Sequence, residues 1–203
     1  QCELLDVTIR NAKRLKRLAD GILDVARIES HSLKLNKEEF NLNDVILNCI
    51  DDITMNRYSN KMEKGVRISY EPTDIFLEAD RERISQVVSN LLSNALKFTS
   101  KGSISISSTV SSDGNENDVY NANDDDNNKM AIINVKDDGQ GIAPDLLPSL
   151  FSKFVSKSFE GTGLGLYISK SIVEAHGGKI WGENNSDGKG ATFTFALPLN
   201  MTG

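Results

Sequence analysis

The stretch NLLSNALKFT, residues 90–99, places polar side chains on a predicted helix whose other positions are apolar. The helix begins upstream, where Asp80 is a candidate N-cap residue. Apolar residues at helical spacing predict a wide buried stripe of Ile84, Val87, Val88, Leu91, Leu92, Ala95 and Leu96. Asn90, Asn94 and Lys97 are four and three residues apart, so they share one side. Two amides and an ammonium could hold a metal ion and its phosphates; the alternative is an ordinary solvated face.

The composition permits one folded core with a small additional element. The chain has 203 residues, 38% apolar and 26% charged, and no apolar run reaches the roughly 18 residues of a membrane span. Cys2 and Cys49 have neither metal-ligand nor disulfide-framework spacing, which favours a reducing cytoplasm. Because the chain begins at Gln1 inside a helical pattern, we expect a cytoplasmic fragment whose parent reaches a membrane only through upstream regions.

The net charge of −6 is concentrated in one segment. Residues 111–129 hold six acids, six asparagines and one lysine, and therefore contribute −5. The remainder is nearly neutral, which gives no argument for nucleic-acid binding. The segment is too polar to bury a core, so we predict a flexible acidic insertion in a hairpin. A calcium loop is the alternative, but the EF-hand spacing and its glycine are absent.

Residues 1–30 predict one long helix with an apolar seam at alternating spacings of three and four. The seam consists of Leu5, Thr8, Ala12, Leu15, Ala19, Ile22 and Ala26. The polar face consists of Arg10, Lys13, Arg14, Lys16, Arg17, Asp20 and Asp24. This pattern favours a helix that stands clear of its own domain and packs on a bundle or dimer partner; packing on its own domain is the alternative.

The remaining segments predict an alternation of short strands and helices. Predicted strands contain Leu33 and Leu35, residues 66–70, residues 75–79, residues 104–110, residues 130–137, residues 179–183 and residues 192–197. We expect residues 66–79 and 179–197 to form hairpins. Two further helices are expected, one over residues 43–64 with Asn43 as its cap and Gly65 as its stop, and one over residues 164–175.

Two glycine-containing clusters follow the amide-bearing helix. Asp137-Asp138-Gly139-Gln140-Gly141 places carboxylates at a strand end, before backbone that glycine lets bend closely. Gly161-Thr162-Gly163-Leu164-Gly165-Leu166 is a glycine loop that opens into a helix, where free N–H groups favour an anion. A Walker P-loop is absent. The three clusters together therefore indicate a nucleotide site better than any one of them.

The combination resembles the ATP-binding domain of sensor histidine kinases, within the wider gyrase, Hsp90, histidine kinase and MutL superfamily. NLLSNALKFT is similar to the N box, DDGQGI to the first glycine box, LFSKF to the F box and GTGLGL to the second glycine box, in the family's order. The resemblance implies a two-layer α/β sandwich, the Bergerat fold, with three helices on a mixed five-stranded sheet. Residues 33–203 would be this catalytic domain, and residues 1–32 the second helix of the dimerisation and phosphotransfer hairpin.

The resemblance also implies the site residues and their ligands, ATP and Mg²⁺. Asn94 would coordinate Mg²⁺, Asn90 would contact metal or phosphate beside it, and Lys97 would offset phosphate charge. Asp137 would accept the exocyclic amino group of adenine. At Gly139 and Gly141, which lack side chains, the main chain would run close to the nucleotide. The lid contacts to the phosphates would come from Lys157, Gly161, Thr162, Gly163, Leu164 and Gly165, while Phe98, Phe151 and Phe154 would be packing residues.

Three departures from the family pattern qualify this picture. Hydrolytic members carry a Glu where this chain has Asn90, and an amide cannot act as a general base, which favours phosphoryl transfer over hydrolysis. The lid over residues 156–160 is short, and an Arg common near Ser156 is missing. The two histidines, His31 and His176, do not match the phosphoacceptor position, so we expect that histidine on a helix upstream of Gln1.

The leading interpretation is the catalytic core of a sensor histidine kinase. It would dimerise through the helical hairpin of the full-length protein and pass phosphate from a histidine to an aspartate of a response-regulator receiver domain. An anti-sigma-type serine kinase shares the nucleotide boxes, although the heptad seam argues against it. A non-catalytic scaffold that binds nucleotide weakly or not at all is the other alternative; the intact Asn94, Asp137 and glycines argue against it, and the altered lid leaves it open.

Overall fold

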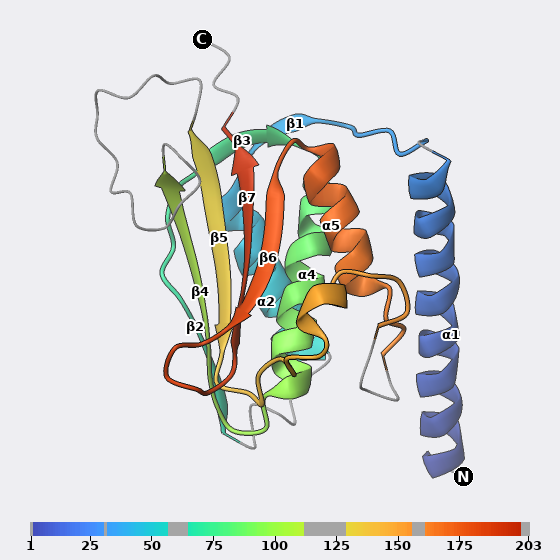
Figure 1. Cartoon of the computed structure of the whole chain (residues 1–203). Coiled ribbons are helices and arrows are strands. Elements are labelled where there is room, and N and C mark those ends of the chain that lie inside the picture. Colours follow the sequence, from blue (N-terminus) through green and yellow to red (C-terminus); the bar gives the residue numbers. More distant parts are fainter. Residues whose placement is uncertain (1, 31, 57–64, 112–128, 156–160, 200–203) are drawn as a thin grey trace.

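The computed structural model describes residues 2–30, 32–56, 65–111, 129–155 and 161–199 (Figure 1). The elements follow the order α1 (Cys2–Glu29), β1 (Glu38–Asn41), α2 (Leu42–Asn56), β2 (Val66–Tyr70), β3 (Phe76–Ala79), α4 (Arg81–Phe98), β4 (Gly102–Ser111), β5 (Met130–Asp137), η2 (Leu147–Ser149), α5 (Gly165–Ala175), β6 (Lys179–Asn184) and β7 (Ala191–Pro198). None of the helices in these ranges carries an apolar stretch long enough to cross a bilayer.

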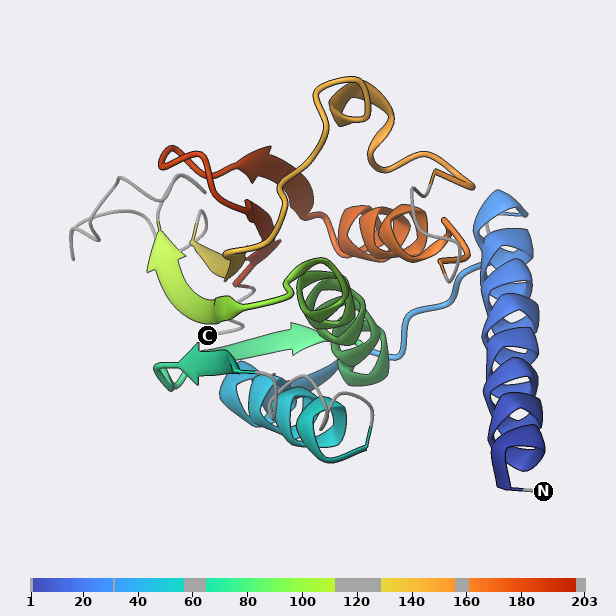
Figure 2. The ribbon, with the colours of Figure 1, turned by 90° about the horizontal axis from the view of Figure 1, so that it is seen from below.

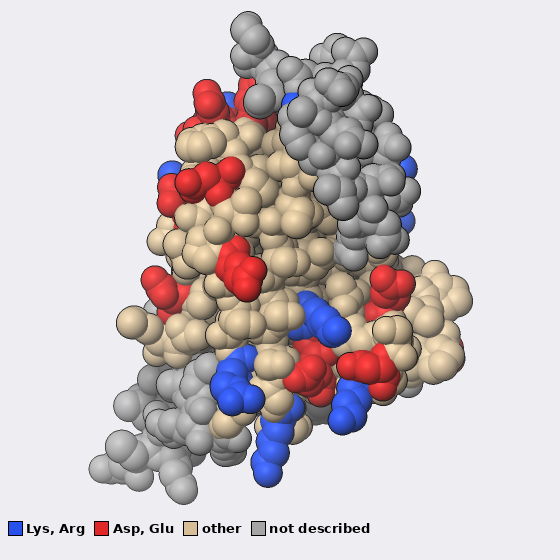
Figure 3. Space-filling view, turned by 90° about the vertical axis from the view of Figure 1, so that its left-hand side faces the viewer, with Lys and Arg blue, Asp and Glu red and all other residues tan. Residues whose placement is uncertain are grey.

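The sheet has five strands in the order β2-β4-β5-β7-β6. β2 and β4 are parallel and the other neighbours are antiparallel, so the sheet is mixed. Helices α2, α4 and α5 cover one face, and α1 stands beside them (Figure 2). The other side of the molecule, seen in Figure 3, has mostly uncharged side chains over the sheet. The predicted two-layer α/β sandwich with three helices on a mixed five-stranded sheet is confirmed.

Helix α4 lies at the centre of the helical layer, as its sequence pattern predicts. All seven positions of the predicted apolar stripe are buried. Asp80 caps the helix, since its Oδ1 accepts a hydrogen bond from the N–H of Arg83 at 3.0 Å. With one face buried and its start capped, α4 is a rigid support for the polar residues along its edge.

His176 joins the end of α5 to the start of α4. Its Nε2 accepts a hydrogen bond from the N–H of Asp80 at 3.0 Å, so its Nδ1 carries the hydrogen and donates it to the carbonyl of Ile172 at 2.8 Å. The residue is 6% exposed. The expectation that His176 is not the phosphoacceptor agrees with this structural role, and His31 lies outside the described residues.

The buried histidine gives the fold a pH dependence. Burial lowers the pKa of His176 below its ordinary value of 6.5, although the hydrogen bond to Ile172 acts to raise it. The unfolded chain therefore binds this proton at a higher pH than the folded chain, and the stability present above pH 6.5 is lost as the pH falls from that value through the lower pKa of the folded chain. We expect the urea concentration at the unfolding midpoint to be lower at about pH 5.5 than at about pH 7.5. The drop should be smaller in His176→Gln; equal drops in both proteins would contradict this account.

Three local predictions are wrong. Residues 66–79 form no hairpin, because β2 pairs in parallel with β4 while β3 pairs with β1. Leu33 and Leu35 lie in an extended connection without a ladder partner, and the strand begins at Glu38. Helix α2 starts at Leu42, where Asn41 rather than Asn43 supplies the side-chain acceptor, for the N–H of Asn43 at 3.0 Å.

The other strand predictions hold. β4 and β5 are antiparallel neighbours, and the predicted insertion between them lies outside the described residues apart from its ends. β6 and β7 form the predicted C-terminal hairpin, paired from Lys179 with Ala196 to Asn184 with Ala191. The sheet therefore carries β5 at its centre, with its last residue, Asp137, at the end of the molecule where α4 also ends (Figure 1).

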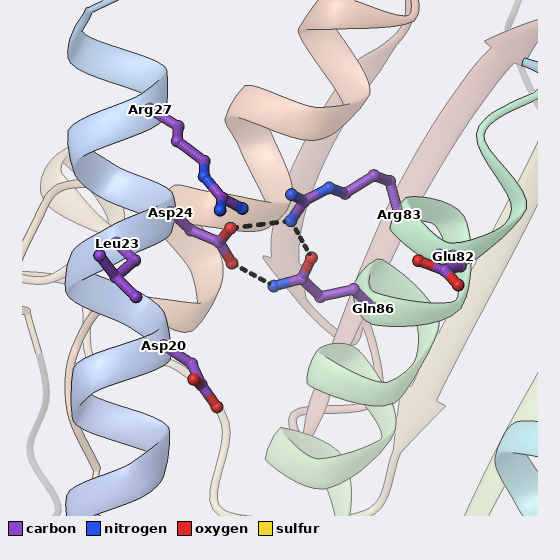
Figure 4. A pocket seen from close by; sticks show the side chains of 7 residues that line it. All are labelled: Asp20, Leu23, Asp24, Arg27, Glu82, Arg83 and Gln86. Atoms are coloured by element: carbon purple, nitrogen blue, oxygen red, sulfur yellow. Dashed lines mark hydrogen bonds and ion pairs between the residues drawn. The ribbon is translucent and has the colours of Figure 1, made fainter. Parts of the chain in front are cut away.

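The predicted single helix over residues 1–30 is confirmed as α1, although it does not stand clear of its own domain. Leu15 and Ile22 of the predicted seam are 69% and 57% exposed, as expected for residues that await a partner. Asp24, assigned to the solvated polar face, is instead 8% exposed and pairs with Arg83 of α4 (Figure 4). The error arose because helical spacing identifies faces but not which charged residue finds a partner far along the chain.

Candidate nucleotide-binding site

The three predicted clusters lie along α4: α5 begins beside the middle of α4, and β5 ends where α4 ends (Figure 1). The backbone of Gly139 passes the end of α4 so closely that an added Cβ would lie 2.7 Å from the carbonyl oxygen of Phe98. On the other side, Asn90 of α4 donates to the carbonyl of Gly165, the first residue of α5, at 3.3 Å. Segments widely separated in sequence thus form one site around the second half of α4.

The amide of Asn90 is held in one orientation. Its Nδ2 donates to the carbonyl of Gly165 and to the Oγ of Ser169, both at 3.3 Å. Since the nitrogen is used by α5, the oxygen is the atom left to face a ligand. Ser169 is fully buried and was missed by the sequence reasoning, because a serine on the apolar face of a helix has no recognisable pattern.

Asn94 and Lys97 continue the polar edge of α4 beyond Asn90. Both are half-buried. The Nζ of Lys97 lies 5.0 Å from the centroid of the Phe98 ring, so its charge stays near the C-terminal end of the helix. Carboxylate and amide oxygens together with phosphate oxygens suit Mg²⁺. The described residues contain no group of three or more His, Cys, Asp or Glu that could hold a metal ion.

Asp137 is a buried carboxylate, with 4% of its surface exposed. Burial raises its pKa above 3.8, although hydrogen bonds from the N–H groups of Gly139 and Ala191 act to lower it. The bond from Gly139 measures 2.8 Å to Oδ1. A buried carboxylate with a raised pKa is a strong acceptor for a ligand N–H group. Burial removes water from the charged oxygens, and each further hydrogen-bond donor replaces part of that lost hydration.

Asp138 has a different role from its neighbour. Its Oδ2 accepts hydrogen bonds from the hydroxyl of Ser103 at 2.6 Å and from the N–H of Ser103 at 2.7 Å. These bonds, first that of the hydroxyl and then that of the backbone, lower the pKa of Asp138. Asp138 therefore fastens the end of β5 to the start of β4, which leaves Asp137 as the only member of the pair suited to a ligand.

The turn between β6 and β7 is hydrogen-bonded to the main chain on both sides of the first glycine cluster. Asn184 binds the backbone of Ile142 twice: its Oδ1 accepts from the N–H at 2.6 Å, and its Nδ2 donates to the carbonyl at 2.8 Å. Asn185 donates to the carbonyl of Asp137 at 2.9 Å. Gly190, at φ +72°, lies so close that an added Cβ would be 1.8 Å from the same carbonyl oxygen. The sequence reasoning missed these residues, whose signal was the run Asn184-Asn185-Ser186-Asp187-Gly188.

The second glycine cluster begins α5. Gly163 has φ +69°, and an added Cβ would lie 2.5 Å from the backbone carbon of Phe154, so only glycine fits there. Thr162 accepts a hydrogen bond from the N–H of Leu164 through its Oγ1 at 3.3 Å. Leu164 is buried at 1% exposure. Gly161 is half-buried, and Lys157 lies outside the described residues.

The predicted aromatic packing is only partly right. Phe151 packs against the core, and Phe98 is half-buried at the end of α4. Phe154 is 71% exposed and has φ +63°, so its side chain does not pack as expected. The close approach of Gly163 to the Phe154 backbone explains the difference, because the contact here is made by main chain rather than by the ring.

Comparison with known proteins identifies the family. The family model described as histidine kinase-, DNA gyrase B-, and HSP90-like ATPase matches residues 79–201, which contain all three clusters. Among curated proteins, the sensor histidine kinase WalK of Bacillus subtilis is 32% identical over 202 residues, with 96% of this chain and 30% of WalK covered. The sensor protein KdpD of Clostridium acetobutylicum is 33% identical over 207 residues, with 98% and 21% covered. The chain thus spans less than a third of these relatives.

Solved structures agree. The catalytic domain of histidine kinase ThkA has a TM-score of 0.61 and 33% identity, with 81% of this chain and 96% of that one covered. Full-length ShkA in complex with AMPPNP has a TM-score of 0.74 and 25% identity, with 98% and 38% covered. The buried Asp137, the amides of α4 and the start of α5 thus lie on a fold that these kinases share. The chain belongs to the family of histidine kinase-, DNA gyrase B- and HSP90-like ATPases, as an ATP-binding catalytic domain of the histidine kinase type.

Proposed function

We propose that this chain is the Mg-ATP-binding catalytic core of a sensor histidine kinase, which transfers the γ-phosphoryl group to a histidine on a separate helix. The observation that carries the proposal is the junction of α4 and α5, where Gly165 and Ser169 accept hydrogen bonds from the amide nitrogen of Asn90, which leaves its amide oxygen available as a metal or phosphate-side ligand. Bound Mg²⁺ would neutralise phosphate charge there, and Asn94 and Asn90 would be its protein ligands.

The protein's own groups would act by binding and positioning. Asp137 would accept the amino group of adenine, and the first turn of α5 would face the phosphates with its free N–H groups. Lys97 would offset phosphate charge. Since Asn90 cannot take a proton from water, these residues favour a protein nucleophile that arrives on its own helix over hydrolysis.

Partners follow from the same proposal. The parent protein would dimerise through a helical hairpin that contains α1, whose Leu15 and Ile22 are exposed, and would pass phosphate to an aspartate of a response regulator. The relatives WalK and KdpD, named as sensor proteins, support this assignment.

A transfer assay tests the proposal and its alternatives. The chain is mixed with γ-labelled ATP and Mg²⁺, with and without a helical hairpin that carries a histidine followed by an acid. We expect Mg-dependent ATP binding by calorimetry, no phosphate release above the buffer rate, and acid-labile, alkali-stable label on the hairpin. Multiple-turnover phosphate release would instead identify a hydrolase, acid-stable label on serine a serine kinase, and a lack of nucleotide binding a scaffold.

A further inference from the structure

The turn between β6 and β7 lies at the end of β5, next to the buried carboxylate of the candidate site (Figure 1). The ladder of the two strands ends with the pair Asn184 and Ala191, so the turn comprises residues 185–190. Its first residue, Asn185, is half-buried, whereas residues 186–189 are exposed. A half-buried amide at the start of an exposed turn indicates that its side chain has partners in another part of the chain.

The side chain of Asn185 uses both ends of its amide. Its Nδ2 donates to the carbonyl of Asp137 at 2.9 Å and to the carbonyl of Lys189 at 2.6 Å. Its Oδ1 accepts a hydrogen bond from the hydroxyl of Thr192 at 2.7 Å. Two carbonyl acceptors on one side and a hydroxyl donor on the other fix the orientation of the amide. Asn185 therefore cross-links the turn, the start of β7 and the end of β5.

The bond from Asn185 to Asp137 comes just past the end of the ladder between β5 and β7. The last pair of that ladder is Lys136 with Thr192. One residue further along β5, the carbonyl of Asp137 accepts its hydrogen bond from the Asn185 side chain. Gly190 lies against the same carbonyl, where an added Cβ would be 1.8 Å from the oxygen. The main chain of Asp137 is thus held against the turn although the regular ladder has stopped.

The same junction orients the carboxylate of Asp137. The N–H groups of Gly139 and Ala191 donate hydrogen bonds to this carboxylate. Ala191 immediately follows Gly190, the glycine that lies against the Asp137 carbonyl. The turn therefore contacts Asp137 at two groups, the carbonyl through Asn185 and the carboxylate through the N–H of Ala191. A displacement of the turn would change both contacts together.

We propose that Asn185 is a positioning residue for base recognition, which acts through Asp137 and makes the preference for adenine depend on the turn between β6 and β7. A hydrogen bond weakens steeply when its distance and angle depart from their optimum, so the carboxylate must be held in place to receive an amino group. Without the Asn185 cross-link, the nucleotide itself must order the end of β5, which lowers affinity. The inference rests on the proposed nucleotide site and adds a residue that sets its specificity.

Calorimetry with ATP and with GTP, each with Mg²⁺, tests the role of Asn185. Asn185→Ala should weaken ATP binding by roughly two- to tenfold, the equivalent of one net hydrogen bond, and GTP binding by less, so that the ratio of the two affinities falls. Asp187→Ala is the matched control, because Asp187 is exposed in the same turn and accepts a hydrogen bond from the N–H of Lys189 at 3.0 Å. It should keep both affinities. Equal weakening of ATP and GTP binding in Asn185→Ala would indicate a general structural role and overturn the proposal.

A double-mutant cycle supplies the second readout. In an Asp137→Ala background, Asn185→Ala should cost little further ATP affinity, because the residue through which it acts is gone, whereas additive losses would overturn the proposal. Should Asn185→Ala unfold, Thr192→Val replaces it, since this change removes the hydroxyl that holds the Asn185 oxygen and should shift the ATP-to-GTP ratio in the same direction. Failure of wild type to bind nucleotide would overturn the proposed function together with this inference. A wild type that prefers ATP and a folded Asn185→Ala with the same preference would overturn the inference alone.

Discussion

Asp137→Ala is expected to weaken ATP binding by roughly ten- to a hundredfold, the range that one hydrogen bond to a charged group supports. The Asp137 carboxylate is buried at 4% exposure and has a raised pKa, because burial removes its hydration. A hydrogen bond from a ligand amino group replaces part of that hydration and therefore stabilises the complex. Guanine would present an oxygen at the same place. The variant should therefore also lose the preference for ATP over GTP, measured by calorimetry with each nucleotide.

The neighbouring Asp138→Ala is the matched control. Asp138 uses its Oδ2 on Ser103, so its loss should lower the urea midpoint while leaving the ATP affinity of the folded protein near that of wild type. A similar loss of ATP affinity in both variants would contradict the role of Asp137. It would show that binding depends on an intact conformation at the end of β5 rather than on a hydrogen bond to the Asp137 carboxylate.

The same carboxylate gives binding a pH dependence with a definite sign. Because the pKa of Asp137 is raised above 3.8 in the free protein and a bound amino group favours the ionised form, binding should release protons in the acidic range. Affinity should therefore fall as the pH falls toward the raised pKa. Titrations in two buffers of different ionisation enthalpy measure the protons released, and Asp137→Ala should release none by this route.

Asn94→Ala is expected to remove the Mg²⁺ dependence of ATP binding and to lower phosphoryl transfer by roughly a hundredfold or more, as the loss of one electrostatic stabiliser does in other enzymes. Asn94 follows Asn90 by one helical turn on the polar edge of α4, where an amide oxygen can complete a shell of waters and phosphate oxygens. Calorimetry of ATP binding with and without Mg²⁺ measures the first effect, and label transfer to an acceptor hairpin measures the second.

Ser93→Ala is a suitable control, since Ser93 is half-buried on the same turn of α4 and carries no assigned role. It should retain both the Mg²⁺ dependence and the transfer rate. If Asn94→Ala keeps its full Mg²⁺ response, the metal role proposed for Asn94 is wrong, whatever happens to the rate.

Periodicity predicted local structure well where one pattern governed a whole element. Each of the seven apolar positions of α4 is buried, and the Asp80 cap is present. The pairing of β2 and β3 was mispredicted, because a turn between two strands suggests a hairpin while the ladder is decided by which strand lies alongside after folding. Parallel pairing of β2 with β4 requires α4 as the crossover, which no local pattern encodes.

The sequence alone determined the order and spacing of the three clusters, and with them the family and the helix edge of Asn90 and Asn94, because these depend on residue type and short-range geometry. Tertiary structure decided the rest. Only folding buries Asp137 against Gly190, aims the Asn90 nitrogen at α5 and brings Asp24 to Arg83 across 59 residues. Burial and hydrogen-bond partners come from segments remote in sequence, so their physical effects exist only in the folded protein.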